Sequence, residues 1–180
     1  MNSKATNRAI FLDRDGVINI DKQYVSKIED FEFTEGIFEL LNYFQDLGYI
    51  LIIITNQSGI GRGYYTLQDF QTLTKWKLSR LSDEGITIHE VYYCPHSPES
   101  ECSCRKPSPE MLLRAKEKYD IDMQNSWMIG DKQSDIEAGK RAGVGRTVFI
   151  ASSRNMVEKF GADFLIYDVR ELKELIGRGE

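Results

Sequence analysis

Short apolar runs alternate along this chain with segments of helical periodicity, and this alternation limits the possible folds more than any other feature. The expected strands are residues 9–12, 49–54, 91–93, 127–129 and 147–150, with 164–167 at the sheet edge. The expected helices are residues 37–47, 67–81, 109–119, 131–142 and a short C-terminal segment. Strands and helices that alternate in this way form a parallel sheet with both faces covered. The sequence therefore predicts an α/β fold with a doubly wound parallel sheet.

Length and charge limit the kind of protein this can be. The chain has 180 residues, 41% of them hydrophobic, which suits a single domain over 1–180. The net charge of −5 argues against general nucleic-acid binding, which depends on a basic surface. No apolar run reaches the roughly 18 residues of a membrane span, and Met1–Arg8 lacks the core of a signal peptide. We expect a cytoplasmic, monomeric protein with no nucleic-acid or membrane partner.

Polar motifs stand at or near the ends of the expected strands, and each one taken alone has an ordinary structural explanation. Asp and Gly are common in turns, and Asp is also favoured at the start of a helix. The carboxyl ends of parallel strands meet at one edge of the sheet, where ligands bind in open α/β folds. We therefore expect the motifs to surround one crevice. They are Asp13-Arg14-Asp15-Gly16, Thr55-Asn56-Gln57-Ser58-Gly59, Arg105-Lys106-Pro107 and Gly130-Asp131-Lys132-Gln133-Ser134-Asp135.

Two of these motifs gather carboxylates, and the other two supply donors for an anion. Carboxylates at one sheet edge repel one another unless a cation lies between them, and oxygen ligands of this kind select Mg²⁺. Thr55 and Asn56 supply a hydroxyl and an amide, while Arg105 and Lys106 supply positive charge. The combination predicts a magnesium-dependent site that binds a phosphoryl group.

The motifs and their order resemble the haloacid dehalogenase (HAD) superfamily of phosphatases across most of the chain. The resemblance implies a Rossmann-like core and a reaction that passes through an aspartyl phosphate. Asp13 would attack phosphorus. Asp15 would protonate the leaving oxygen and then activate water, which favours a phosphatase over a dehalogenase.

The same resemblance implies the binding groups of the site. Mg²⁺ would be held by the carboxylates of Asp13 and Asp131 and by the backbone carbonyl of Asp15. Thr55 and Lys106 would hold the phosphoryl oxygens. Asp135, the last carboxylate of the fourth motif, would orient this lysine or the metal shell rather than ligate directly.

A cluster of cysteine and histidine predicts a second metal. All three cysteines and one of the two histidines lie in a single short segment. A set of three cysteines and one histidine (Cys3His) is an established tetrahedral zinc site. Four protein ligands, with no open position, indicate a structural role. The alternative is a chance cluster with an unpaired thiol. The expected zinc ligands, in a loop over 94–104 that leads into Arg105 and Lys106, are Cys94, His96, Cys102 and Cys104.

Zinc loops of this type resemble one branch of the superfamily, which contains heptose bisphosphate phosphatases and histidinol phosphatases. The segment from Thr55 to Tyr65 resembles the heptose enzymes, whereas the short spacing from His96 to Cys102 resembles the histidinol enzymes. The resemblance therefore implies a sugar-phosphate substrate, namely the 7-phosphate of D-glycero-D-manno-heptose 1,7-bisphosphate, and a place in lipopolysaccharide biosynthesis. The alternatives are histidinol phosphate as substrate, or a non-catalytic module stabilised by zinc.

No interval between the motifs is long enough for a separate cap domain. We therefore expect an open, capless site whose walls are three loops, residues 18–26, residues 59–65 and the cysteine loop. An open site expels less water than a closed one, so it depends on fixed charges and donors. Asn19 and Asp21, in the first of these loops, are expected near the substrate.

Overall fold

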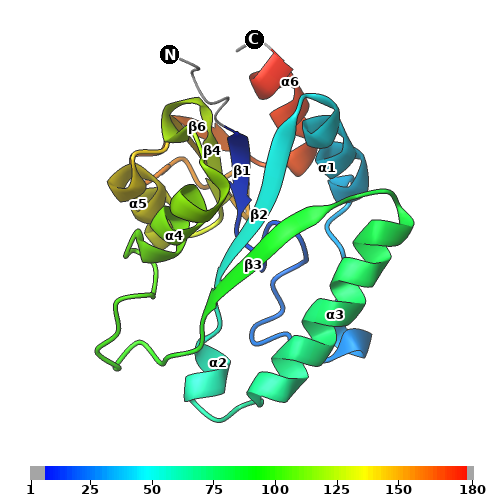
Figure 1. Ribbon diagram of the computed structural model, residues 1–180, viewed down its shortest axis with the longest axis vertical. Helices are drawn as coiled ribbons and strands as arrows, with labels where there is room; N and C mark the ends of the chain where they lie inside the picture. Colours follow the sequence, from blue (N-terminus) through cyan, green and yellow to red (C-terminus); the bar gives the residue numbers. More distant parts are fainter. Residues whose placement is uncertain (1–6, 178–180) are drawn as a thin grey trace.

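The computed structural model describes residues 7–177, so the outermost ends of the expected domain, 1–6 and 178–180, lie outside the described residues. Its centre is a sheet of six strands in the order β3-β2-β1-β4-β5-β6, and every neighbouring pair is parallel (Figure 1). The predicted doubly wound α/β fold is confirmed. The strands are β1 (Arg8–Leu12), β2 (Tyr49–Asn56), β3 (Ile88–Cys94), β4 (Trp127–Gly130), β5 (Arg146–Ile150) and β6 (Phe164–Ile166).

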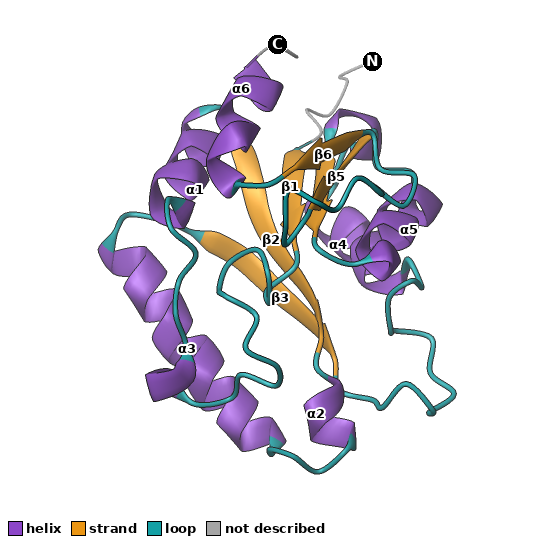
Figure 2. Cartoon of the chain, turned by 180° about the vertical axis from the view of Figure 1, so that it is seen from behind, coloured by secondary structure: helices purple, strands orange, loops and turns teal. Residues whose placement is uncertain are grey.

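Helices cover both faces of the sheet (Figure 2). One face carries α1 (Ile37–Asp46), α3 (Leu67–Asp83) and α6 (Leu172–Gly177). The other face carries α4 (Glu110–Tyr119) and α5 (Gln133–Ala142). A single helical turn, α2 (Ser58–Gly61), follows β2. The remaining turns are the 3-10 helices η1 (Ile28–Asp30), η2 (Met123–Asn125) and η3 (Val169–Glu171).

The core is divided by the sheet because successive side chains of a strand point to opposite faces. In β1, Ile10 and Leu12 pack with α1, α3 and α6, whereas Ala9 and Phe11 pack with α4 and α5. All four side chains are fully buried. Burial on both faces explains why the central strands are apolar almost throughout, without polar alternation.

The central position of β1 decides which loops meet. Leu12, its last residue, lies beside Ile53 of β2 on one side and beside Ile129 of β4 on the other. Residues that follow β1, β2 and β4 therefore lie next to one another, although they are far apart in the sequence. The motifs singled out above come together at this edge of the sheet.

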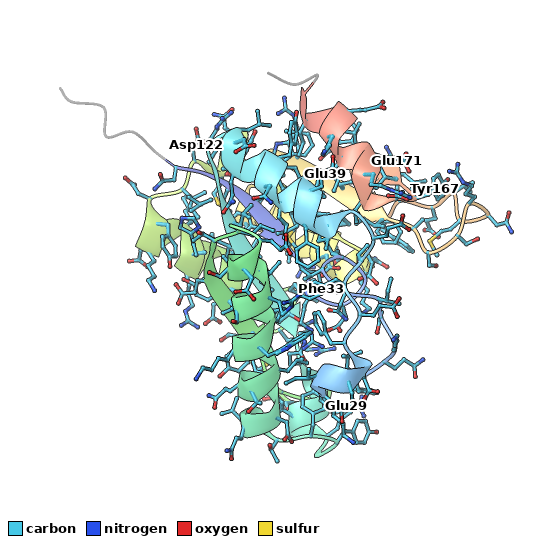
Figure 3. All side chains as sticks on the ribbon, turned by 90° about the vertical axis from the view of Figure 1, so that its right-hand side faces the viewer. Glu29, Phe33, Glu39, Asp122, Tyr167 and Glu171 are labelled. Carbon is cyan, nitrogen blue, oxygen red and sulfur yellow. The ribbon has the colours of Figure 1, made fainter. Side chains whose placement is uncertain are left out.

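The loop after β1 is held against α3 by aromatic packing. The ring centroids of Phe31 and Phe33 lie 5.7 and 6.0 Å from that of Trp76 on α3. Figure 3 shows Phe33 beside this helix, on the side of the molecule that faces the viewer. Such pairs add about 0.5–1.5 kcal/mol to the burial of each ring. The contact fixes the long segment between β1 and α1 over the end of the sheet.

Most predicted elements are present, with differences at their boundaries. β3 begins at Ile88, before the predicted 91–93, because its polar residues His89 and Glu90 lie at the sheet edge, where β3 pairs only with β2. α5 begins at Gln133 and not at residue 131. Within residues 7–177, no helix is long and apolar enough to cross a membrane.

Candidate active site

Three carboxylates, two directly after neighbouring strands and one on α5, form the centre of the site. Asp13 directly follows β1, and its backbone N–H donates to the carbonyl of Ile129 in β4 at 3.0 Å. Asp131 follows β4, and Asp135 lies in the first turn of α5. One carboxylate oxygen from each of the three lies within 4.8 Å of the others. Like charges this close and this buried require positive charge between them.

Lys106 supplies part of that charge. Its Nζ lies 2.8 Å from Oδ1 of Asp13 and 2.7 Å from Oδ1 of Asp135, and it donates to the carbonyl of Ile54 at 2.6 Å. Burial alone would lower the pKa of Lys106, but the two carboxylates raise it, so the side chain stays charged. Asp135 thus contacts the lysine, the arrangement expected of a residue that orients Lys106.

One lysine does not neutralise the whole group. Burial and the repulsion of Asp135 raise the pKa of Asp13 to about 6, although Lys106 opposes them. Burial and the charge of Asp13 raise the pKa of Asp131 to about 8. Oδ1 of Asp131 is buried and has no hydrogen-bond partner among the described residues. A divalent cation with a preference for oxygen would satisfy this atom and the excess negative charge, so the donor set fits Mg²⁺.

Gly16 lets the loop after β1 approach these carboxylates. Its φ is +85°, a conformation that glycine adopts without strain. A Cβ at this position would lie 2.2 Å from Oδ2 of Asp131. Glycine is therefore required here both for the backbone conformation and for the space beside the carboxylate.

Asp15 is held rigidly at the edge of the cavity. Arg14 donates to both of its oxygens, at 3.0 Å from Nε and 2.7 Å from Nη2, and Asn19 donates to Oδ1 at 3.1 Å. Burial would raise the pKa of Asp15, but the charge and hydrogen bonds of Arg14 lower it. Before a substrate binds, Asp15 is therefore ionised, the form that accepts a proton.

A cavity of about 550 Å³ opens beside Asp15 and the segment that follows β2. Its wall includes Asp15 and four cationic residues, which are Arg14, Arg62, Arg105 and Lys132. Nη1 of Arg105 is buried and lacks a hydrogen-bond partner in the part of the chain that the structure describes. The cavity thus presents positive charge around Asp15, which suits an anionic substrate.

Asn56 connects the end of β2 to the segment that carries Lys106. Its amide donates to the carbonyl of Lys106 at 3.1 Å and accepts from the N–H of the same residue at 3.0 Å. Thr55, immediately before it, is 1% exposed and lies at the end of the same strand. The two predicted phosphate-binding segments are therefore joined by two hydrogen bonds between the Asn56 side chain and the Lys106 backbone.

The two residues expected near the substrate take different positions. Asn19 is fully buried, does not line the cavity, and instead donates to Asp15 and to the carbonyl of Ile20. Asp21 does line the cavity and accepts from Nζ of Lys132 at 3.3 Å. Asn19 acts on the site through Asp15 because its amide is turned inward.

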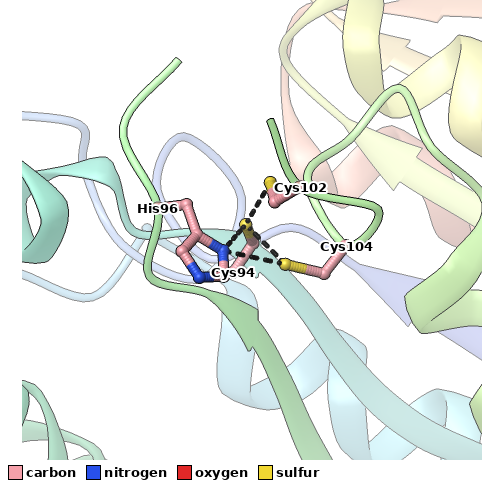
Figure 4. Close-up of side chains that lie close together, drawn as sticks. All are labelled: Cys94, His96, Cys102 and Cys104. Carbon is pink, nitrogen blue, oxygen red and sulfur yellow. Dashed lines mark hydrogen bonds between the residues drawn. The ribbon is translucent and has the colours of Figure 1, made fainter. Parts of the chain in front are cut away.

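The cysteines and histidine of the loop converge on one point (Figure 4). Sγ of Cys94 lies 3.7 Å from Sγ of Cys102 and 2.8 Å from Sγ of Cys104. Nδ1 of His96 lies 3.5 Å from Sγ of Cys94 and 3.3 Å from Sγ of Cys104. A tetrahedral zinc ion spaces two sulfurs by about 3.8 Å and a sulfur and a nitrogen by about 3.6 Å. Three of these four separations are within a few tenths of an ångström of those values, so the set fits zinc.

This loop is packed against the segment after β2 that is predicted to bind phosphate. The carbonyl of Cys94 accepts from the N–H of Gln57 at 2.8 Å. A Cβ on Gly61 of α2 would lie 2.5 Å from the backbone nitrogen of Ser97. Arg62 pairs with Glu99 of the loop at 3.1 Å. The loop and the segment after β2 therefore form one wall of the cavity.

Comparison with known proteins identifies the family. A HAD-hydrolase-like family model matches residues 103–172. A D-glycero-β-D-manno-heptose-1,7-bisphosphate 7-phosphatase of Helicobacter pylori is 56% identical over 140 residues, which cover 77% of this chain and 81% of that protein. This chain belongs to the heptose-bisphosphate phosphatase family.

Other heptose-bisphosphate phosphatases extend the similarity over nearly the whole chain. A D-glycero-α-D-manno-heptose-1,7-bisphosphate 7-phosphatase of Campylobacter jejuni is 49% identical over 169 residues, which cover 94% of each protein. The crystal structure of the D,D-heptose 1,7-bisphosphate phosphatase of B. bronchiseptica, complexed with magnesium and phosphate, matches with a TM-score of 0.87. The match covers 96% of this chain and 99% of that one, at 24% identity, and therefore shows the shared fold.

Two buried polar residues of this heptose-bisphosphate phosphatase family member escaped sequence reasoning. Gln57 stands inside a recognised motif but received no role, because its contact with Asp15 joins it to a distant segment. Lys77 is fully buried on α3, although lysine is ordinarily exposed. Its helical spacing from Phe70, Leu73 and Leu81, all buried on the same helix, was the signal that could have revealed it.

Proposed function

We propose that this protein removes the 7-phosphate of D-glycero-D-manno-heptose 1,7-bisphosphate with Asp13 as the nucleophile and with bound Mg²⁺. The observation that carries the proposal is the position of Asp13, which is buried beside Lys106 and Asp131 at the end of β1. Its relatives at 40–56% identity are named for this reaction. The resemblance of this protein to the heptose enzymes implies that its product serves lipopolysaccharide biosynthesis.

The reaction divides into two displacements at phosphorus. A carboxylate oxygen of Asp13 forms a bond to phosphorus as the bond from phosphorus to the sugar oxygen breaks. Asp15 takes up a proton from solvent as the anionic phosphoryl group enters, and it gives this proton to the sugar oxygen as that oxygen departs. Asp15 then takes a proton from water, which attacks phosphorus, frees Asp13 and produces inorganic phosphate.

The binding groups act on the phosphoryl oxygens. Lys106 orients Asp13, and Thr55 offers a hydroxyl at the end of β2. Mg²⁺, held by the carboxylates of Asp13 and Asp131 and by the carbonyl of Asp15, would neutralise charge on the attacking and transferred groups. These donors are fixed before the substrate arrives, which is how such sites lower the barrier.

The charges of the cavity favour a bisphosphate. Arg62, Arg105 and Lys132 line its wall, so a second anionic group on the substrate would find partners there. Histidinol phosphate carries a protonated amine in the corresponding part of the molecule, which these cations would repel. The histidinol alternative rested on the spacing between His96 and Cys102. The relatives at 40–56% identity are named as heptose enzymes, which favours the heptose substrate. The same relatives are enzymes, which overturns the non-catalytic module.

We also propose that Cys94, His96, Cys102 and Cys104 bind a structural zinc ion. The ion would hold the loop that leads into Arg105 and Lys106, and so would keep the two cations in place. Zinc content of the purified protein tests this, with one ion expected per chain and none after Cys94→Ser. A cytoplasmic location and a monomeric state stay predictions.

Phosphate release tests the proposed reaction. Heptose 1,7-bisphosphate and histidinol phosphate are compared with Mg²⁺, and we expect a preference for the heptose of at least about a hundredfold in kcat/KM, roughly 2.7 kcal/mol. Asp13→Asn and Asp15→Asn should lose turnover. Asp46→Asn, an exposed position on α1, serves as the matched control. Turnover that survives Asp13→Asn would exclude the aspartyl-phosphate route.

A further inference from the structure

The side-chain amide of Gln57 connects three segments at the edge of the cavity. Gln57 follows β2 and is 2% exposed. Its Nε2 donates to Oδ2 of Asp15 at 3.2 Å and to Oγ1 of Thr55 at 2.8 Å. Its Oε1 accepts from the hydroxyl of Tyr65 at 2.6 Å. One buried amide therefore touches the predicted acid and a predicted phosphate-binding residue together.

The Tyr65 hydroxyl fixes which way this amide points. A glutamine amide has a donor end and an acceptor end of nearly equal size, and its partners decide between them. Burial raises the pKa of Tyr65 to about 12, so the hydroxyl keeps its proton and donates to Oε1. The NH₂ group must then face Asp15. Without the hydroxyl, the amide could turn its oxygen toward the Asp15 carboxylate, where the two would repel.

The contact with Gln57 also limits the proton of Thr55. Because Oγ1 of Thr55 accepts from Nε2 of Gln57, the hydroxyl keeps its own hydrogen for another acceptor. A phosphoryl oxygen of the bound substrate would be such an acceptor. The Gln57 amide thus holds the Asp15 carboxylate and, at the same time, orients the Thr55 hydroxyl.

Gly59 makes this arrangement possible. A Cβ at Gly59 would lie 2.1 Å from Cε1 of Tyr65, so any other residue would displace the ring. The ring therefore lies directly on the backbone of α2, and its hydroxyl reaches Gln57. The glycine-containing segment after Thr55 therefore positions Tyr65 in addition to forming part of the cavity wall.

We propose that Tyr65 and Gln57 are positioning residues that hold Asp15 in the orientation needed to protonate the leaving oxygen. The inference rests on the proposed function, since it assumes that Asp15 is the acid. Asp15 receives two hydrogen bonds on each oxygen, and only the one from Gln57 depends on a residue outside the loop after β1. Tyr65 and Gln57 therefore join the acid to the β2 side of the cavity.

The dependence on the leaving group distinguishes positioning of the acid from general structural damage. A sugar alkoxide needs a proton to depart, whereas p-nitrophenolate departs without one. The value of kcat/KM covers the steps up to release of the leaving group, so it is measured for heptose 1,7-bisphosphate and for p-nitrophenyl phosphate. We compare the wild-type protein with Tyr65→Phe, Gln57→Met, the double variant and Asp15→Asn.

We expect Tyr65→Phe to lower kcat/KM about tenfold for the sugar phosphate and less than about threefold for the aryl phosphate. The double variant should be no worse than Gln57→Met alone, because the hydroxyl acts through the amide. Tyr119→Phe is the matched control, since it removes a hydroxyl that donates to Glu90 at 2.7 Å, at the end of α4 distant from the site.

Equal losses on the two substrates, or additive losses in the double variant, would overturn the inference. So would a Tyr65→Phe protein indistinguishable from Tyr119→Phe. The failure of the proposed function looks different. In that case, the wild-type protein would release no phosphate from the heptose, or Asp15→Asn would lower kcat/KM equally for both substrates.

Discussion

Replacing Lys77 with methionine should stabilise the protein near neutral pH. Lys77 is fully buried on α3, and its Nζ has no hydrogen-bond partner among residues 7–177. Burial and the nearby charge of Arg14 lower its pKa to about 7, although Asp15 and Asp13 oppose the shift. Methionine keeps a similar unbranched shape and removes the ammonium group.

The magnitude follows from the difference in pKa between the two states. In the unfolded chain, lysine titrates near about 10.4. Between about pH 7 and 10.4 the unfolded state binds a proton that the folded state does not, so the free energy of unfolding rises with pH. The slope is about 1.4 kcal/mol per pH unit, and the penalty at pH 7 therefore approaches about 4 kcal/mol. Because Lys77→Met also removes the attraction to the two aspartates, we expect a net gain of about 1–4 kcal/mol at pH 7.

Urea unfolding at pH 7, 8, 9 and 10 measures this effect. The difference between Lys77→Met and the wild type should be largest at pH 7 and should shrink as the pH rises, because high pH neutralises the lysine in both states. Lys75→Met, at an exposed position on the same helix, controls for the change of residue type. A Lys77→Met protein that is less stable at pH 7, or a difference that does not vary with pH, would refute the reasoning.

Three further perturbations test the site and its loop. Gly16→Ala should cost about 1–3 kcal/mol of stability and most of the phosphatase activity, since the new methyl group would meet Asp131 in a left-handed backbone conformation; unchanged activity would exclude this close approach. A chelator that removes zinc and leaves Mg²⁺ in excess should lower both the Tm and the rate of phosphate release, while a colorimetric indicator follows the loss of zinc. Full activity without zinc would show that the cysteine loop does not support the active site. Gly61→Ala should weaken zinc retention, measured by the same indicator, because its Cβ would collide with Ser97. Gly85→Ala, with open space but a φ of +77°, should strain the backbone without a collision and should leave zinc retention unchanged.

Elements whose signal is local could be predicted from the sequence. Tyr49–Ile54 is apolar on both faces because α1 and α4 cover the two sides of β2, so its hydrophobic run announced a buried strand. Asp13 and Asp131 were paired in advance because both follow such strands. The rule that ligands bind at the carboxyl ends of parallel strands then placed them at one edge.

Features that depend on distant partners could not be predicted in the same way. The single turn of α2 is too short for any helical period, and its position depends on contact with the cysteine loop. The inward rotation of Asn19 depends on Asp15 and on the turn around it, which the sequence of the loop does not reveal. The sequence placed Gln57 in a motif at the site but did not reveal its role, because that role depends on the hydrogen bond from the Tyr65 hydroxyl.

The pairing of β1 with β4 has a consequence for the newly made chain. Asp13 leaves the ribosome early, but Asp131 and its strand emerge only after more than two-thirds of the 180 residues have been synthesised. Until β4 is inserted beside β1, Asp13 has no Asp131 and no Asp135 beside it, and the metal ligands stand apart. An unfinished chain therefore cannot assemble this centre, and any substrate turnover reports on molecules whose sheet is already complete across β1 and β4.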